Sequence, residues 1–175
     1  MAELRQSIRF GTSRDGTRIA YATMGRGPPL VRGGSHFLTH LELDLVSPMW
    51  RPWLVELSRN HTFIRSDPRG CGLSDRDVSD FSIAASVADI EAVVDAARLD
   101  RFALFGASQG SAAAIAYAAQ HPERLTHLVI YGGFARGLMK RNPTPEEVRE
   151  ARAMLELVEV GWGRENPAYR QMFTS

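Results

Sequence analysis

The chain has 175 residues, of which 44% are hydrophobic and 23% charged, the composition of a globular domain. A chain of this length buries about 70% of its unfolded surface, so it needs no disulfide or metal to hold a core. The 21 basic and 20 acidic residues give a net charge of +1, which argues against a nucleic-acid-binding protein. The longest apolar run, 112–119, is far shorter than the roughly 20 residues that span a bilayer, so no membrane partner is expected. The single cysteine and the absence of an apolar N-terminal segment predict a cytoplasmic location.

The first elements are predicted to be an antiparallel pair of strands, a third strand and a helix. Ranges 8–10 and 17–24 alternate as strands do, and Asp15-Gly16 between them is a hairpin signal. Leu30-Val31 is expected to be a short buried strand that ends at Gly33-Gly34. Range 48–58 is predicted to be a helix, because apolar residues recur at helical spacing: Trp50, Trp53, Leu54 and Leu57.

The middle of the chain alternates strands with helices. A strand over 61–66 runs into the glycine-rich loop 67–75. Range 82–98 is an amphipathic helix whose apolar stripe is expected to leave Asp89 largely outside; the stripe consists of Ile83, Val87, Ile90 and Val94. A strand over 101–105, an alanine-rich helix over 109–120 and a strand over 125–131 follow.

This alternation predicts an α/β fold: a mostly parallel sheet of about six strands, with an antiparallel N-terminal edge hairpin and helices on both faces. After about Gly137 the sequence becomes charged and helical. Thr144 and Glu147 form a capping box, Pro145 suits the first helical position, and Gly161 suits the C-terminal end. Two regions are therefore expected, a core over 1–137 and a helical segment over 138–175.

The segment 102–114 carries the motif with chemical meaning, Gly106-x-Ser108-x-Gly110. It lies directly after a predicted strand and directly before a helix, which is the context that a nucleophile elbow requires. So sharp a turn strains the serine backbone, and side chains at the two glycines would collide across it. The turn would expose the Ser108 hydroxyl and aim the N–H of Gln109 at an oxyanion. The alternative is an ordinary βα turn with a helix-capping serine.

With these residues the chain resembles the N-terminal part of an α/β-hydrolase. The matching elements are Gly27–Val31 before a small-residue loop, the loop 67–74, the elbow 106–110, and His121–Arg124 before an apolar strand. Ranges 12–16 and 38–42 are similar to the hydrolase-like domains of some bacterial multidomain regulators, which can be fused to a cyclase or a DNA-binding module. The segment 138–175 resembles the beginning of the helical lid of such a hydrolase.

The resemblance implies a serine hydrolase with Ser108 as the catalytic nucleophile and the N–H of Gln109 in the oxyanion hole. The family's second oxyanion donor comes from the loop after the third strand, here a backbone N–H of His36 or Phe37. That loop usually begins His-Gly, and in this chain Arg32 takes the place of the histidine.

The loop 67–75 has a structural and a functional interpretation. In the favoured structural one, its glycines make tight turns while Arg69 and Asp75 pair or cap locally. In the functional one, the loop borders the active site and positions its neighbours. Cys71 is not expected to be a nucleophile, because it sits in a glycine turn with no helix after it.

The general base and its acid are not evident. The family's chain order is serine, acid, histidine, and after Ser108 the sequence contains only His121 and His127, both predicted far from the elbow. Of the other histidines, only His36 and His40 could approach it. We therefore expect a truncated hydrolase, whose sixth strand would be an exposed apolar edge covered in a homo-oligomer.

The sequence thus predicts an α/β-hydrolase acting on an ester, thioester, lactone or similar acyl bond, weak or inactive as this chain alone. The alternatives are a non-catalytic small-molecule-binding module of a regulatory protein and a fragment with a structural role only. No cofactor is expected, because the elbow glycines do not form Gly-x-Gly-x-x-Gly, and no metal, because the histidines and the cysteine are scattered singly.

Overall fold

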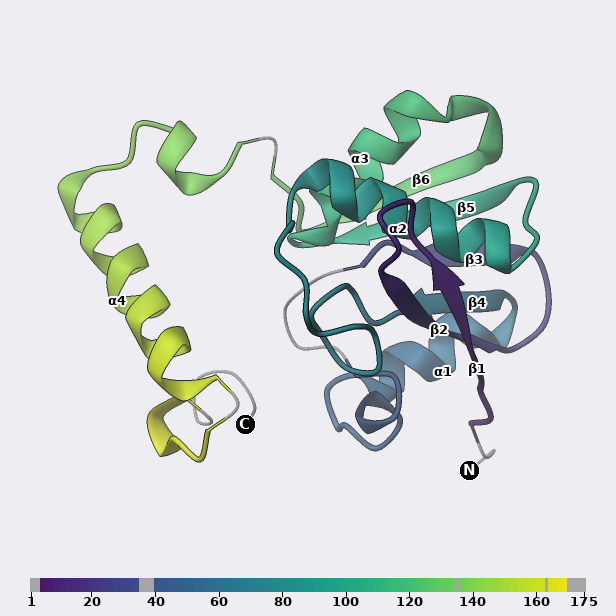
Figure 1. Cartoon of the computed structure of the whole chain (residues 1–175), viewed down its shortest axis with the longest axis horizontal. Helices are drawn as coiled ribbons and strands as arrows, with labels where there is room; N and C mark the ends of the chain where they lie inside the picture. The colour runs from purple at the N-terminus through teal and green to yellow at the C-terminus, as the bar shows by residue number, and fades with distance from the viewer. Residues whose placement is uncertain (1–3, 35–39, 135, 163, 170–175) are drawn as a thin grey trace. The chain divides into compact units, whose positions relative to one another are not determined.

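The computed structural model describes residues 4–34, 40–134, 136–162 and 164–169. The chain divides into two compact units, Met1–Phe134 and Ala135–Ser175 (Figure 1). The first unit holds a sheet with its helices and the second holds a long helix, so each is described by itself.

The first unit is built on one six-stranded sheet with the order β1-β2-β4-β3-β5-β6. Its strands are β1 (Ser7–Thr12), β2 (Arg18–Met24), β3 (Pro29–Arg32), β4 (Thr62–Ser66), β5 (Phe102–Ala107) and β6 (Leu125–Tyr131). Strand β2 pairs antiparallel with both β1 and β4, whereas β4, β3, β5 and β6 run parallel. This is the mostly parallel sheet with an antiparallel edge hairpin that the sequence predicts.

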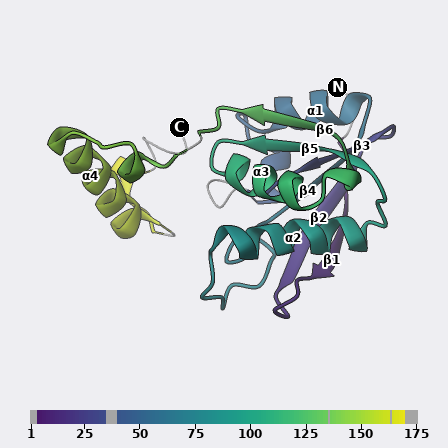
Figure 2. The same ribbon diagram turned by 90° about the horizontal axis from the view of Figure 1, so that it is seen from above.

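Three helices flank the sheet in the positions expected. They are α1 (Arg51–Arg59), α2 (Ile83–Ala96) and α3 (Gly110–Gln120). The short 3-10 helix η1 (Leu43–Leu45) precedes α1, and η2 (Pro122–Arg124) lies between α3 and β6. Helices α1 and α2 lie on opposite sides of the sheet (Figure 2). Ser82 caps α2 by accepting a hydrogen bond from the N–H of Ala85.

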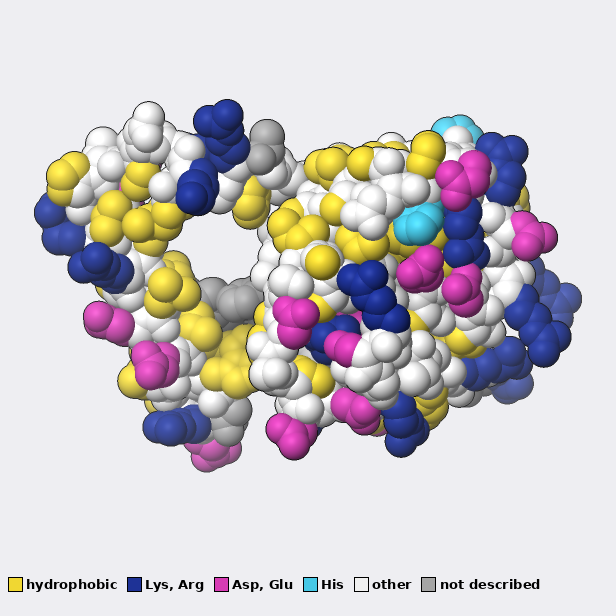
Figure 3. All heavy atoms as spheres, turned by 45° about the horizontal axis from the view of Figure 1, so that its top comes forward, with side chains coloured by type: hydrophobic (Ala, Val, Ile, Leu, Met, Phe, Trp, Pro, Cys, Tyr) yellow, Lys and Arg dark blue, Asp and Glu magenta, His cyan; other side chains and the backbone are white. Residues whose placement is uncertain are grey.

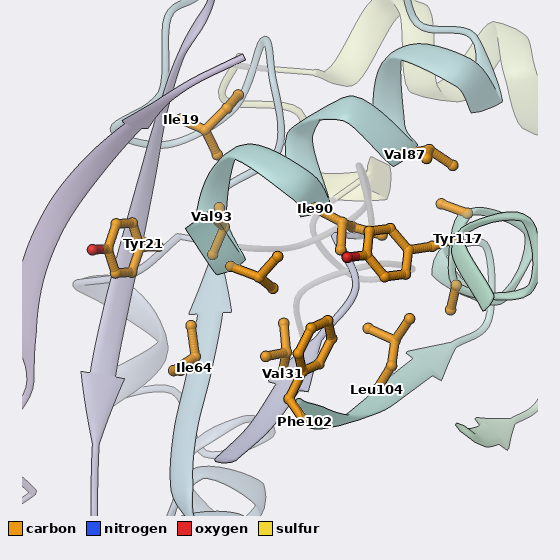
Figure 4. Packing of buried hydrophobic residues seen from close by; sticks show 13 residues of the cluster. Ile19, Tyr21, Val31, Ile64, Val87, Ile90, Val93, Phe102, Leu104 and Tyr117 are labelled. Carbon is orange, nitrogen blue, oxygen red and sulfur yellow. The ribbon is translucent and has the colours of Figure 1, made fainter. Parts of the chain in front are cut away.

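Each face of the sheet has its own hydrophobic core. The larger core joins the sheet to α2 and α3 (Figure 4) and contains Ile19, Tyr21, Val31, Ile64, Val87, Ile90, Val93, Val94, Phe102, Leu104, Ala113, Ala114 and Tyr117. The smaller core joins the sheet to α1 and contains Met24, Leu30, Leu54, Phe63 and Phe105. Because side chains alternate along a strand, Val31 enters the larger core and its neighbour Leu30 the smaller one. The residue after Val31 therefore projects toward the α1 side.

Strand β6 forms one edge of the sheet and pairs only with β5 among the strands of the described sheet. It is apolar yet exposed, with side chains at 40–60% exposure along its second half: Leu128, Val129, Ile130 and Tyr131. An exposed hydrophobic edge of this kind is a site where further strands or chains pair.

The second unit contains η3 (Leu138–Lys140) and α4 (Pro145–Gly161). The predicted capping box is present: Thr144 Oγ1 accepts from the N–H of Glu147, and the Glu147 carboxylate accepts from the N–H of Thr144. Gly161 is the last helical residue, and a Cβ there would lie 2.4 Å from that of Tyr169. Several hydrophobic side chains at or after α4 are exposed, in the unit that Figure 3 shows rich in yellow: Met154, Leu155, Val160 and Trp162.

Within the described ranges, no helix has the length and hydropathy to cross a membrane. The face of the first unit in Figure 3 carries basic and acidic side chains next to each other. This intermixing agrees with the near-neutral net charge of the sequence.

Candidate active site

Ser108 lies in the turn that joins β5 to α3, and its backbone is in the left-handed region, with φ at +49°. The turn is fixed by the Ser108 N–H, which donates to the carbonyl of Tyr131 at 2.9 Å, and by its carbonyl, which accepts from the N–H of Ser111 at 3.1 Å. A residue other than glycine in this conformation costs on the order of 1–3 kcal/mol. The side chain is exposed, and within the described chain its hydroxyl makes no hydrogen bond. The strand extends two residues beyond the predicted end, so the serine follows it almost directly.

The two glycines of the motif are required by close approach. A Cβ at Gly106 would lie 2.7 Å from the Cβ of Ala114, and a Cβ at Gly110 would lie 2.9 Å from the carbonyl oxygen of Gly34. Both distances are too short for real carbon contacts. The contact at Gly106 confirms the collision predicted across the turn, whereas at Gly110 the collision is with the loop after β3, against which the start of α3 packs.

The Gln109 backbone has the setting that an oxyanion donor needs. Gln109 is exposed, precedes the first residue of α3, and its N–H donates no hydrogen bond within the described residues. A helix N-terminus adds partial positive charge at this point. The second predicted donor, the N–H of His36 or Phe37, lies outside the described residues, and its register stays a prediction.

Ser108 borders a cavity of about 370 Å³. Its lining combines α1, the segment before it and the ends of β3, β4, β5 and β6: Arg32, Met49, Trp50, Trp53, Leu54, Leu57, Phe63, Phe105, Ala107, Ser108, Tyr131 and Gly132. Trp53 stacks on Phe105 at a centroid distance of 6.3 Å and meets Tyr131 edge-on at 5.4 Å. An apolar cavity with few polar groups is the usual form of a small-molecule site.

Trp50 and Trp53 were predicted to share one face of a helix, and the structure also places both in the wall of this cavity. Their spacing was the available signal: both tryptophans lie on the apolar face of the helix predicted over 48–58, and in the structure Trp50 directly precedes α1. Arg32 was noted only as a substitute for the usual histidine, and the structure places its side chain in the cavity wall.

None of the described histidines is hydrogen-bonded to Ser108. The Nδ1 atom of His40 accepts from the N–H of Glu42 at 3.2 Å, which occupies that ring nitrogen locally. His121 follows α3, at the opposite end from the elbow, and its ring lies 4.7 Å from that of Tyr117. His61 precedes β4, and His127 is near the start of β6. The remaining histidine, His36, lies outside the described residues.

The loop 67–75 has the structural role that the sequence favours, but its arginine is not paired locally. Arg69 donates two hydrogen bonds to Asp89 on α2, at 2.6 and 2.9 Å, and one to Asp15 in the hairpin at 2.7 Å. Asp89 is buried, so the expectation that it lies outside the apolar stripe is wrong. A charged residue can occupy a buried helix position when its partner comes from another element.

The other polar groups of this loop are also satisfied. Asp75 accepts from the N–H of Arg18, and the hydroxyl of Ser74 donates to the carbonyl of Asp67 while accepting from the N–H of Ala20. Burial raises the pKa of the Cys71 thiol, with Asp67 adding to the effect. A raised pKa leaves the sulfur protonated at neutral pH, as expected for a cysteine that is not a nucleophile.

Within the described residues, no three histidine, cysteine, aspartate or glutamate side chains gather to hold a metal ion. Ser108 places an exposed hydroxyl beside a backbone N–H and a mostly apolar cavity, which are groups of the kind that acyl transfer uses.

Comparison with known proteins agrees with this arrangement. A family model described as the alpha/beta hydrolase fold matches residues 33–168. The chain therefore belongs to the α/β-hydrolase fold family, as its sequence resemblance implies. The more specific likeness to domains of multidomain regulators stays a prediction.

Two curated bacterial relatives illustrate the match. Pyrrolizixenacetamide deacetylase of Xenorhabdus hominickii is 29% identical over 131 residues, covering 75% of this chain and 47% of that protein. Cis-3-alkyl-4-alkyloxetan-2-one decarboxylase of Shewanella oneidensis is 31% identical over 141 residues, covering 76% and 41%. The chain thus spans less than half the length of these relatives.

A solved structure shares the fold. An alpha/beta fold family hydrolase from Bacillus anthracis aligns with a TM-score of 0.72 over 96% of this chain and 60% of that one, at 18% identity.

Proposed function

We propose that the chain is the nucleophile-bearing part of a serine hydrolase that acts on an ester, thioester, lactone or similar acyl bond. One observation carries this proposal: Ser108 is held in a strained backbone conformation with its hydroxyl exposed beside an apolar cavity. Strain is retained where a function needs the conformation. The names of the two relatives support acyl chemistry, since they contain an acetamide and an oxetan-2-one.

In the proposed reaction, the Oγ of Ser108 attacks the acyl carbon and its proton passes to a general base. The carbonyl electrons move onto the oxygen, where the N–H of Gln109 and a second N–H from His36 or Phe37 stabilise the negative charge. Collapse of this intermediate expels the leaving group with a proton from the base. Water then hydrolyses the acyl-enzyme through the same oxyanion site.

We propose that the base and its acid come from sequence outside this chain or from a partner chain, because the described histidines do not reach Ser108. This chain alone would then be weakly active or inactive. Loss of the histidine from a serine hydrolase triad lowers turnover about a million-fold. The helical segment 138–175 would be the beginning of a lid, and its exposed hydrophobic side chains support that role: Met154, Leu155, Val160 and Trp162.

A fluorophosphonate probe tests the proposal, because it reacts with activated serines. We expect slow labelling of the wild-type chain, because the Gln109 N–H is present but the base is not, loss of labelling in Ser108→Ala, and no change in Ser86→Ala, whose serine lies on α2. A folded chain that takes up no label, or an unchanged label in Ser108→Ala, would contradict an activated nucleophile at this position.

A second candidate function is a non-catalytic small-molecule-binding module of a regulatory protein. This function is favoured because, among the described residues, no base is hydrogen-bonded to the hydroxyl of Ser108. In this case a ligand would bind the cavity of the folded chain while the probe would not react. A purely structural fragment would neither bind nor react.

The apolar edge at β6 supports a further proposal, a homo-oligomer in which a second copy covers this strand. Sedimentation should then show an assembly larger than a monomer at micromolar protein concentration. A well-folded monomer would contradict it. We also propose a cytoplasmic location, since the sequence has one cysteine, which is half-buried.

A further inference from the structure

The cavity beside Ser108 has one charged side chain in its described lining, and the proposed reaction does not use it. Arg32 is the last residue of β3, where it is in register with Arg65 of β4 and Phe105 of β5. Its side chain lies on the α1 side of the sheet and is only 8% exposed, yet it lines the same cavity as Ser108.

The guanidinium of Arg32 is stacked but has no hydrogen-bond partner among the described residues. Its Cζ lies 4.8 Å from the centre of the Trp50 ring, a cation–π contact that holds the planar group in place. An arginine that lies over an aromatic ring keeps its N–H donors at the edge of the guanidinium, where they can bind a ligand in the guanidinium plane.

Two carboxylates are close enough to act on Arg32, and each accepts hydrogen bonds from other groups. Asp44 pairs with Arg65 and accepts from the N–H of His40. Asp67 accepts from the N–H groups of Leu41 and Leu73.

The charge of Arg32 is maintained in these surroundings. Burial lowers the pKa of Arg32 and so does the neighbouring Arg65, whereas Asp44 and Asp67 raise it. An arginine starts from so high a pKa that it remains cationic at neutral pH.

The other two buried arginines of this unit each make several hydrogen bonds, although the Nε of Arg65 has no partner among the described residues. Arg69 makes its hydrogen bonds to Asp89, Asp15 and a backbone carbonyl. Arg65 donates to Asp44, to the carbonyl of Leu41 and to Gln6. A buried cation without such partners is costly unless a ligand supplies them.

We propose that this cavity accepts acyl compounds that also carry a free carboxylate, which Arg32 binds while the acyl carbon faces Ser108. The inference rests on the proposed hydrolase function and names its substrate class. The apolar lining would contact the chain between the two groups, and the guanidinium would bind the carboxylate oxygens in a charge-assisted, two-pronged contact.

Matched ester pairs test this directly. The probes are the monomethyl esters of succinic, adipic and azelaic acids, each compared with its dimethyl ester, which differs only in lacking the charge. Binding is followed by the fluorescence of the tryptophans, two of which line the cavity, in Ser108→Ala so that no turnover occurs. We expect the charged ester to bind at least about tenfold more tightly at one or more chain lengths.

Variants of Arg32 assign the preference to this residue. Arg32→Met should abolish the preference, so that the two esters of a pair bind alike, whereas Arg32→Lys should keep part of it. Arg18→Met is the matched control, because Arg18 also stacks on an aromatic ring, that of Phe10 at 4.6 Å, but outside the cavity. It should keep the full preference.

Equal binding of both esters at every length in the Ser108→Ala protein, or a preference that survives in a folded Arg32→Met, would overturn the inference. Should Arg32→Met fail to fold, the paired esters and Arg32→Lys still decide it. A carboxylate preference without fluorophosphonate labelling would support the anion site and contradict the hydrolase. Fluorophosphonate labelling without the carboxylate preference would support the hydrolase and contradict the anion site.

Discussion

Two glycine-rich turns follow parallel strands of the same sheet, and each contains a serine. The hydroxyl groups of these two serines differ in their hydrogen bonding. In the turn after β4, the hydroxyl of Ser74 is buried and both donates and accepts a hydrogen bond. In the turn after β5, the hydroxyl of Ser108 is exposed, and its backbone is strained. The turn after β4 holds elements together through its hydrogen bonds, whereas the turn after β5 presents an exposed hydroxyl, the proposed nucleophile. The hydrogen bonding of the serine hydroxyl therefore distinguishes a structural turn from the proposed catalytic one better than the number of glycines does.

The largest expected effect on stability belongs to the turn after β4. Arg69→Met leaves Asp89 buried without its partner, so the free energy of unfolding should fall by about 3–5 kcal/mol. Urea unfolding followed by circular dichroism measures this loss. The double variant Arg69→Met, Asp89→Leu should recover much of the stability, because no unpaired charge remains. A single-variant loss below about 1 kcal/mol would show that this turn does not depend on the ion pair.

The next effect concerns packing at the elbow. Gly106→Ala places a methyl group 2.7 Å from the Cβ of Ala114, and overpacking of this kind costs about 1–3 kcal/mol. Gly137→Ala is the control, since Gly137 has an ordinary φ of −59° and open space around its Cβ. Thermal unfolding of both variants checks the difference. Equal melting temperatures would mean that α3 does not lie as close to β5 as described.

A smaller effect should reveal the strain at the nucleophile. Ser108→Gly removes the cost of a side chain at φ +49°, so the free energy of unfolding should rise by about 1 kcal/mol while fluorophosphonate labelling is lost. Ser108→Ala should lose labelling without this gain, because alanine bears the same strain. Identical stabilities of the two variants would contradict a strained turn.

The smallest effect depends on pH and involves Asp15. The N–H of Thr17 and then Arg69 lower the pKa of Asp15 to about 2, from about 3.9 in an unfolded chain. A lowered pKa contributes stability above the unfolded value, and this contribution is lost as the pH falls from about 4 toward about 2. Because Asp15 is partly exposed, the gain over Asp15→Asn should stay below about 1 kcal/mol. A gain that grows on acidification would contradict the assigned bonding.

Most of the fold could be predicted from short sequence patterns, because the interactions behind these patterns involve residues close together in the sequence. Strand and helix periodicity, the hairpin signal at Asp15-Gly16 and the capping box at Thr144 each depend on a few neighbouring residues, and the structure has all of them. The elbow was predictable in part for the same reason, since Gly106 meets Ala114 a few residues away, whereas Gly110 meets Gly34 from a distant loop.

Contacts between distant elements could not be predicted in this way. Asp89 and Arg69 lie 20 residues apart in sequence, and a charged residue on an amphipathic helix is ordinarily placed outside the apolar stripe. The cavity wall combines four strands with α1, so the position of Arg32 in it required the sheet order. These long-range placements are also the ones that carry the specificity proposed here.

A crystal structure of the chain after reaction with a fluorophosphonate tests the central claim most directly. We predict a bond from the Oγ of Ser108 to phosphorus, with the phosphonyl oxygen about 2.7–3.1 Å from the backbone nitrogen of Gln109. A phosphonyl oxygen turned away from Gln109, or an adduct on another residue, would contradict the account of this turn as a nucleophile elbow.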